Sequence, residues 1–151
     1  MPRNLFIIGL SLLFISCQSG ATSDNDATKE SAEKQTLVLD TFNIYEFPAA
    51  IDGCACYFSE KGATEAFIYV DDFAQTAFIK VNGSFEQLEI YDALSKDGVI
   101  KQKCRSEHYG IDINLKEVGH EDETWQYEGT MKFTKIDGSV LNIEVSGECG
   151  C

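Results

Sequence analysis

Positive charge is scarce in this sequence. The chain carries 12 Lys and Arg residues against 25 Asp and Glu, a formal net charge of -13 at pH 7. Proteins that bind nucleic acid present basic surfaces to the phosphate backbone, and an acidic surface repels it. We therefore exclude nucleic acid as a partner, whereas a basic protein or a cation would be attracted.

Motifs of familiar catalytic sites are also missing. The sequence contains no nucleophile elbow, no phosphate-binding loop and no helix of the His-Glu-x-x-His type. Apolar residues at the 3.6-residue period of an amphipathic helix are absent as well. The sequence thus predicts a protein that is not an enzyme and needs no cofactor.

Only one long apolar run occurs, at the N-terminus. It extends from Leu5 to Ile15, follows the basic Arg3 and is broken by Gly9 and Ser11. A membrane-spanning helix needs about 20 apolar residues, so this run is too short to be one. A short basic start followed by such a run is typical of a signal peptide, which we place at residues 1–16.

The end of this run, Phe14-Ile15-Ser16-Cys17, resembles the lipobox of bacterial lipoproteins. The resemblance implies cleavage before Cys17, a diacylglycerol on its sulfur and a fatty acid such as palmitate on its new amino group. Several acyl chains hold a protein durably on a membrane, since each buried methylene contributes about 0.8 kcal/mol. Gln18 follows instead of Asp, which by the enterobacterial sorting rule indicates the outer membrane of a Gram-negative bacterium.

Two segments with different composition follow the lipobox. Residues 18–35 contain no aromatic or branched aliphatic side chain and so have nothing to bury. With Cys17 they form the predicted lipidated, flexible tether, residues 17–35. The remaining residues 36–151 have a typical length for one domain with a single core.

This domain shows the two-residue period of β-strands. Apolar and polar residues alternate from Thr124 to Phe133 and from Leu141 to Cys151, on either side of an Asp137-Gly138 turn. Asn82-Gly83 is a strong hairpin signal between two further strands, 77–81 and 88–90. Other strands are expected at residues 37–47, 66–70, 99–105 and 111–118. About eight strands with short links predict an all-β fold, a single antiparallel meander forming a barrel or a sandwich.

Five cysteines follow Cys17, and four of them form two Cys-x-Cys units that are candidates for disulfides: Cys54, Cys56, Cys149 and Cys151. In a strand, residues two apart share one face and lie about 7 Å apart. A bridge within such a unit would be strained, so each unit needs partners elsewhere. If the two strands are neighbours or face each other, two parallel bridges would close loops of about 95 residues. All five sulfurs are expected to point inward, with Cys104 left over and buried.

Other readings of the cysteines stay open. Cys54, Cys56, Cys104, Cys149 and Cys151 could instead converge as thiolates on zinc or copper, both of which accept sulfur ligands. A weaker alternative gives the odd thiol, Cys104, a nucleophilic role with His108 as its base.

Two further features permit ligand binding. The acidic pair Asp71-Asp72 and the triplet 121–123 are interpreted as solvated turns, with calcium binding as the alternative. Trp125 and the numerous Tyr and Phe residues either fill the core or line a cavity, since an eight-stranded barrel can hold one small ligand.

These observations together predict an envelope-anchored binding or interaction module. Its partners would be the membrane, through the lipid, and a small ligand or a basic protein. The general build resembles the lysozyme-inhibitor lipoproteins, which are also small, β-barrelled and disulfide-bearing. That resemblance carries no site residue over to this chain.

Overall fold

The computed structural model describes residues 36–151. The predicted signal peptide, the lipidated Cys17 and the tether all fall within residues 1–35 and lie outside the described residues. No helix within residues 36–151 has both the length and the apolar character needed to cross a bilayer.

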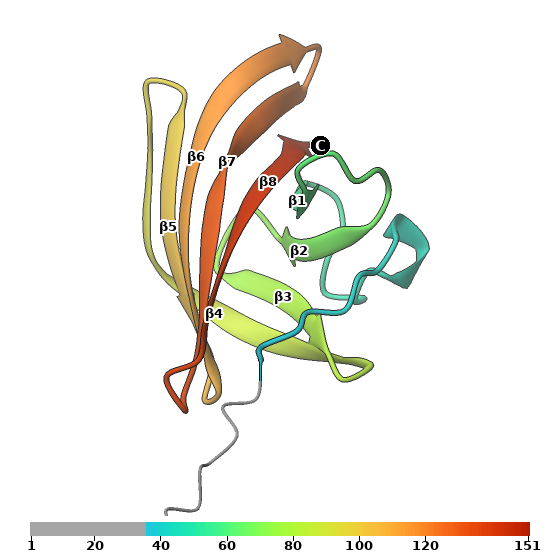
Figure 1. Ribbon diagram of the computed structural model, residues 1–151. Helices are drawn as coiled ribbons and strands as arrows, with labels where there is room; N and C mark the ends of the chain where they lie inside the picture. The colour runs from blue at the N-terminus through green and yellow to red at the C-terminus, as the bar shows by residue number, and fades with distance from the viewer. Residues whose placement is uncertain (1–35) are drawn as a thin grey trace, which may run out of the picture. The chain divides into compact units, whose positions relative to one another are not determined.

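Eight antiparallel strands form a closed barrel in which each strand pairs with its sequence neighbours (Figure 1). Pairing between the first and last strands closes the barrel. The all-β meander prediction is confirmed, and of its two forms the structure is the barrel. The strands are β1 (Ala55–Glu60), β2 (Phe67–Asp71), β3 (Thr76–Val81), β4 (Ser84–Lys96), β5 (Val99–Arg105), β6 (Tyr109–Glu121), β7 (Thr124–Lys135) and β8 (Val140–Gly150).

Two hairpin turns follow directly from Asx-Gly pairs. Asn82 and Gly83, between β3 and β4, have φ angles of 51° and 77°. Asp97 and Gly98, between β4 and β5, have φ angles of 51° and 73°. Positive φ at both central positions gives a turn whose twist matches that of the flanking strands. Asn, Asp and Gly tolerate this conformation better than other residues, so these pairs fix the register of their hairpins.

The strands differ greatly in length, and this shapes one end of the barrel. Strands β4, β6 and β7 have 13, 13 and 12 residues, whereas β1, β2 and β3 have 6, 5 and 6. In Figure 1 the β4–β5 and β6–β7 hairpins therefore reach past the ends of β1 and β2. This end, where the long strands stand opposite the short ones, is called the barrel mouth below.

The barrel interior is filled by the alternating apolar residues. Large side chains from most strands are buried there, among them Phe58, Tyr69, Leu88, Ile113, Met131, Phe133 and Val145. At Gly147 the backbone of β1 and the Phe58 ring leave no room for a side chain. A Cβ at Gly147 would collide with the carbonyl oxygen of Tyr57 and with the Phe58 ring, so no larger residue fits there.

A second apolar cluster covers the outer face of the short strands. Phe42, Ala55, Val70 and Phe78 are buried in it. Both faces of β1 to β3 are therefore buried, and Phe42 comes from the segment that precedes β1. This segment was predicted to be a strand over residues 37–47, and that prediction is wrong.

The segment makes only two isolated bridges, Asp40 with Lys80 and Phe42 with Phe67, followed by the 3-10 helix η1 (Ile44–Glu46). Asn43 caps this helix by accepting a hydrogen bond from the Tyr45 backbone N–H at 2.9 Å. Its apolar residues instead let the segment cover β1 to β3 rather than extend the sheet.

The disulfide candidates are confirmed as two bridges, one between β1 and β8 and one between the residues that immediately flank these strands. Cys56 lies directly opposite Cys149 in the strand pair, and these two are bonded. Cys54 is bonded to Cys151 one step further out. Among residues 36–151, Cys104 is the one free cysteine, and it is buried, as predicted. The expectation that all five sulfurs point inward is wrong for the outer bridge, because Cys151 is exposed.

Candidate functional site

A hollow of about 530 Å³ opens at the barrel mouth. Its volume lies within the range of about 300–1,000 Å³ that is usual for small-molecule pockets. One wall comes from the β4–β5 hairpin and the other from β6, β7, β1 and the loop between β2 and β3. The lining residues are Cys56, Asp71, Phe73, Ala74, Ile90, Ala93, Leu94, Ser95, Gly98, Ile100, Gln102, Glu117, Trp125 and Tyr127.

Much of this lining is apolar and open to solvent. Ile90, Ile100 and Trp125 are half-buried and pack against the barrel core. Phe73 and Leu94, on opposite walls, are 52% and 55% exposed. Large apolar side chains that surround a hollow and are exposed to solvent are typical of binding sites, because burying them against a ligand is favourable. The mouth therefore has the character of a ligand pocket.

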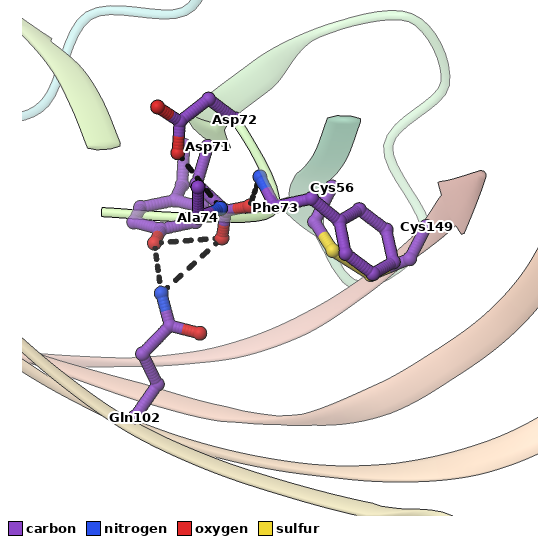
Figure 2. Close-up of a disulfide and its surroundings, with 8 residues drawn as sticks. Cys56, Asp71, Asp72, Phe73, Ala74, Gln102 and Cys149 are labelled. Carbon is purple, nitrogen blue, oxygen red and sulfur yellow. Dashed lines mark hydrogen bonds between the residues drawn. A yellow bond between two sulfur atoms is a disulfide. The ribbon is translucent and has the colours of Figure 1, made fainter. Parts of the chain in front are cut away.

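The floor of the pocket is a buried polar cluster that joins β2 to β5. The Tyr69 hydroxyl donates to Asp71 Oδ2 at 3.0 Å, and Gln102 Nε2 lies 2.9 Å from the Tyr69 hydroxyl and 3.3 Å from Asp71 Oδ2. Figure 2 shows Gln102 reaching from its strand toward Asp71. Cys104 completes the cluster, with its Sγ 3.5 Å from the Tyr69 hydroxyl.

Asp71 is the electrostatic centre of this cluster. Its side chain is 3% exposed, and no ion pair reaches it within residues 36–151. Burial raises the pKa of Asp71, and hydrogen bonds from the Phe73 backbone, Tyr69 and Gln102 only partly oppose this rise. The prediction that Asp71 is a solvated turn residue is wrong, because the carboxyl group faces inward.

Its neighbour Asp72 does act as a turn residue. Asp72 Oδ1 accepts hydrogen bonds from the backbone N–H groups of Ala74 and Thr76, both at 2.9 Å. The backbone N–H of Phe73 donates to Asp71 Oδ1 at 3.0 Å. These bonds hold Phe73 in the left-handed region, with a φ of 61°, which is unusual for an aromatic residue. The loop therefore presents the Phe73 ring at the pocket, beside the Cys56–Cys149 bridge (Figure 2).

The β6 part of the same wall carries the second carboxyl group of the pocket, that of Glu117. Its backbone N–H donates to the carbonyl of Gly98 at 2.7 Å, which ties β6 to the tip of the β4–β5 hairpin. Burial, together with the charge of Glu117, raises the pKa of Tyr127. Trp125, the next pocket residue on β7, stacks on His120 with ring centroids 4.9 Å apart. Aromatic rings and a carboxyl group thus share this wall.

The sulfur chemistry of the site is that of bridged and protonated cysteine. Burial raises the pKa of Cys104 to about 11, although its hydrogen bonds with Tyr69 and Gln102 act in the other direction. Its hydrogen-bond partners do not include His108, which instead places its Nδ1 3.2 Å from a carboxyl oxygen of Glu86. The nucleophilic hypothesis for Cys104 therefore has no support from the geometry around it.

A thiolate metal site would need the bridges to be opened first. Four of the five predicted sulfur ligands, Cys54, Cys56, Cys149 and Cys151, are bonded in pairs. Within the described part of the chain, no three His, Cys, Asp or Glu side chains come together in a way that would hold a metal ion. Zinc or copper binding stays a hypothesis for the reduced protein.

A larger hollow, of about 640 Å³, lies beside β3, β4 and β5. Polar and charged groups dominate its lining, and they already bind one another. The Ser106 hydroxyl donates to Glu86 at 2.6 Å, and Arg105 contacts Glu89 at 3.1 Å. With little apolar surface to bury, this hollow is a weaker candidate than the mouth pocket.

Sequence reasoning found part of the mouth pocket. Trp125 was named as a possible cavity residue and does line it, as does Cys56 of the inner bridge. Tyr69, Gln102 and the inward role of Asp71 were missed. The sequence did contain one signal, the two-residue alternation along β5. Gln102 falls between Ile100 and Cys104 on the apolar side of this strand, where a polar residue needs a buried partner.

Comparisons of the chain with protein-family models, with curated proteins and with solved structures find no match.

Proposed function

We propose that this chain is a lipid-anchored envelope protein that binds a small, largely apolar molecule in the mouth of its barrel, without catalysing a reaction on it. The observation that carries the proposal is the mouth pocket. It combines apolar walls with a few inward polar groups, which is the usual composition of a small-molecule site.

The architecture around the pocket supports binding more than turnover. The Cys56–Cys149 bridge and the Tyr69, Asp71 and Gln102 cluster hold the pocket rigidly, which lowers the entropic cost of ligand binding. The thiol of Cys104, the one nucleophile beside the cluster, stays protonated near neutral pH.

The anchor rests on residues 14–17. A lipid on Cys17 would keep the binding domain at the membrane surface, at the end of a tether that has no residue able to form a core. A bacterial envelope is also an oxidising setting, in which disulfides such as those between β1 and β8 form and persist.

Binding can be measured through Trp125, the only tryptophan of the chain. The full chain carrying Cys17→Ser, exported to an oxidising periplasm, is titrated with the neutral fluorescent probe N-phenylnaphthylamine. We expect saturable energy transfer from Trp125 to the probe. Ala93→Phe fills the pocket from an exposed position of β4, so it should weaken binding by about tenfold or more.

Ala63→Phe is the matched control, because Ala63 is equally exposed but lies in the turn after β1, away from the pocket. It should leave probe affinity unchanged. Equal affinities of the two variants, or no saturable signal in the parent chain, would contradict the proposed pocket.

The anchor is tested separately. Cys17→Ser should abolish incorporation of labelled palmitate and release the protein from the membrane fraction. Cys104→Ser removes a different single thiol and should leave both properties intact. Continued acylation and membrane retention of the Cys17→Ser variant would rule out the lipoprotein assignment.

A further inference from the structure

Every charged side chain that lines the mouth pocket is acidic. Asp71 lies at its floor and Glu117 on its β6 wall, and the described lining contains no Lys, Arg or His. The whole chain carries a net charge of -13, so its field also draws cations toward the surface. An anionic ligand would meet repulsion here and find no counter-charge.

Within residues 36–151, Asp71 has no positively charged partner, although its buried position would make the attraction to such a partner strong. Its carboxyl group is buried, and its three hydrogen-bond donors are the neutral groups of Tyr69, Gln102 and the Phe73 backbone. A carboxylate in low dielectric is costly unless it is paired with a cation. A cation that entered the pocket would favour the ionised form and be favoured by it.

The aromatic rings of the pocket add a second attraction for a cation. Phe73, Trp125 and Tyr127 all line it, as do the two carboxyl-bearing residues Asp71 and Glu117. The faces of such rings attract organic cations, most strongly for Trp. Ile90, Leu94 and Ile100 supply the apolar contacts for the remainder of a ligand.

We infer that the mouth pocket takes a small organic cation, an amine on an aromatic or branched apolar body, with its charge held by Asp71 and Glu117. This rests on the proposed function, because it assigns a ligand class to the same pocket.

The test uses three probes that share one phenethyl skeleton and differ in charge. Phenethylamine is positive, phenethyl alcohol neutral and hydrocinnamate negative at neutral pH. Each competes with N-phenylnaphthylamine for the exported full chain carrying Cys17→Ser. We expect the amine to bind about tenfold more tightly than the alcohol, the order that one partly desolvated cation contact supplies, and the acid to bind most weakly. Methylammonium, which has the charge without the apolar body, should not compete.

Three charge-neutralising variants locate the effect. Asp71→Asn and Glu117→Gln should each reduce the preference for the amine over the alcohol, taken as the ratio of their affinities for the same variant, several-fold. If Asp71→Asn fails to fold, Glu117→Gln still tests the inference, because Glu117 lies on the pocket wall and not in the buried floor. Glu60→Gln removes the same charge from an exposed position at the end of β1, outside the pocket, and should preserve the preference.

The outcomes separate this inference from the proposed function. If the neutral probe binds but amine and alcohol compete equally, or if hydrocinnamate competes best, the pocket stands and the cation inference is overturned. If Glu60→Gln lowers the amine preference as much as Glu117→Gln does, the preference reflects net charge alone. That result also overturns the cation inference. If the neutral probe does not bind at all, both proposals fall.

Discussion

Asp71 binds its proton more tightly in the folded protein than in the unfolded chain, because burial raises its pKa. Ionisation therefore costs stability once the pH exceeds the unfolded pKa of about 3.9. Asp71→Asn removes this cost along with the charge. We therefore expect the difference in free energy of unfolding, variant minus parent, to rise between about pH 3 and pH 7. Urea unfolding of both proteins at several pH values measures this difference.

Asp137→Asn is a control with the opposite sign. Hydrogen bonds from Ser139 hold the pKa of Asp137 below its usual value, so its ionised form stabilises the fold above the unfolded pKa and loses this effect as the pH falls. The relative stability of this variant should fall as the pH rises. A flat profile for Asp71→Asn would mean that its carboxyl group is not desolvated in solution.

At the scale of the single strand, Gly147 sets how closely β1 and β8 pack. A methyl group there would press into the Tyr57 carbonyl and the Phe58 ring. Gly147→Ala should therefore destabilise the protein by about 1–3 kcal/mol, the usual cost of overpacking, as measured by the denaturant midpoint.

Gly110→Ala is the matched control, because a Cβ at Gly110 would have its nearest neighbour, the Cys104 carbonyl, 4.0 Å away. It should be neutral or slightly stabilising, since alanine loses less backbone entropy on folding than glycine. If the two variants had equal stability, the close approach of β1 and β8 would not be real.

The elements were predictable to the extent that their signals were local. Val99–Arg105 was predicted with its observed bounds, and Asn82-Gly83 forms the expected turn. The segment before β1 was mistaken for a strand because a run rich in apolar residues shows only that some side chains are buried, not what they pack against. Phe42 packs over β1 to β3, a contact set by tertiary packing.

The same limit explains the partly predicted site. Trp125 and the bridged cysteines are conspicuous residues, and both were named from sequence. Asp71 was assigned to a solvated turn because Asp-Asp is typical of turns, which is true of Asp72. Only the pairing of β2 within the closed barrel turns Asp71 inward toward Gln102.

At the scale of the whole molecule, the two disulfides constrain the unfolded chain in nearly the same way. They close loops of 97 and 93 residues between the same two strands. One such bridge contributes up to about 4–5 kcal/mol by restricting the unfolded chain, but a second bridge beside it restricts little more.

We therefore expect strong non-additivity between the bridges. Removing either pair by Cys→Ala substitution should cost far less than removing both, which should cost about 4–5 kcal/mol in urea unfolding. Alkylation of the unfolded, unreduced Cys17→Ser chain should modify Cys104 alone, which verifies both bridges beforehand. Single losses that sum to the combined loss would contradict the account.

The position of the outer bridge also determines how the chain responds to mechanical load. A pull applied through the N-terminus acts first on the segment from Thr36 to Cys54, held to the barrel by the Asp40 and Phe42 bridges. Once this segment peels away it spans at most about 65 Å, at roughly 3.3–3.6 Å per residue. When the segment is fully extended, the Cys54–Cys151 disulfide transfers the tension directly to the C-terminus. The strands from β1 to β8 then bear no shear force.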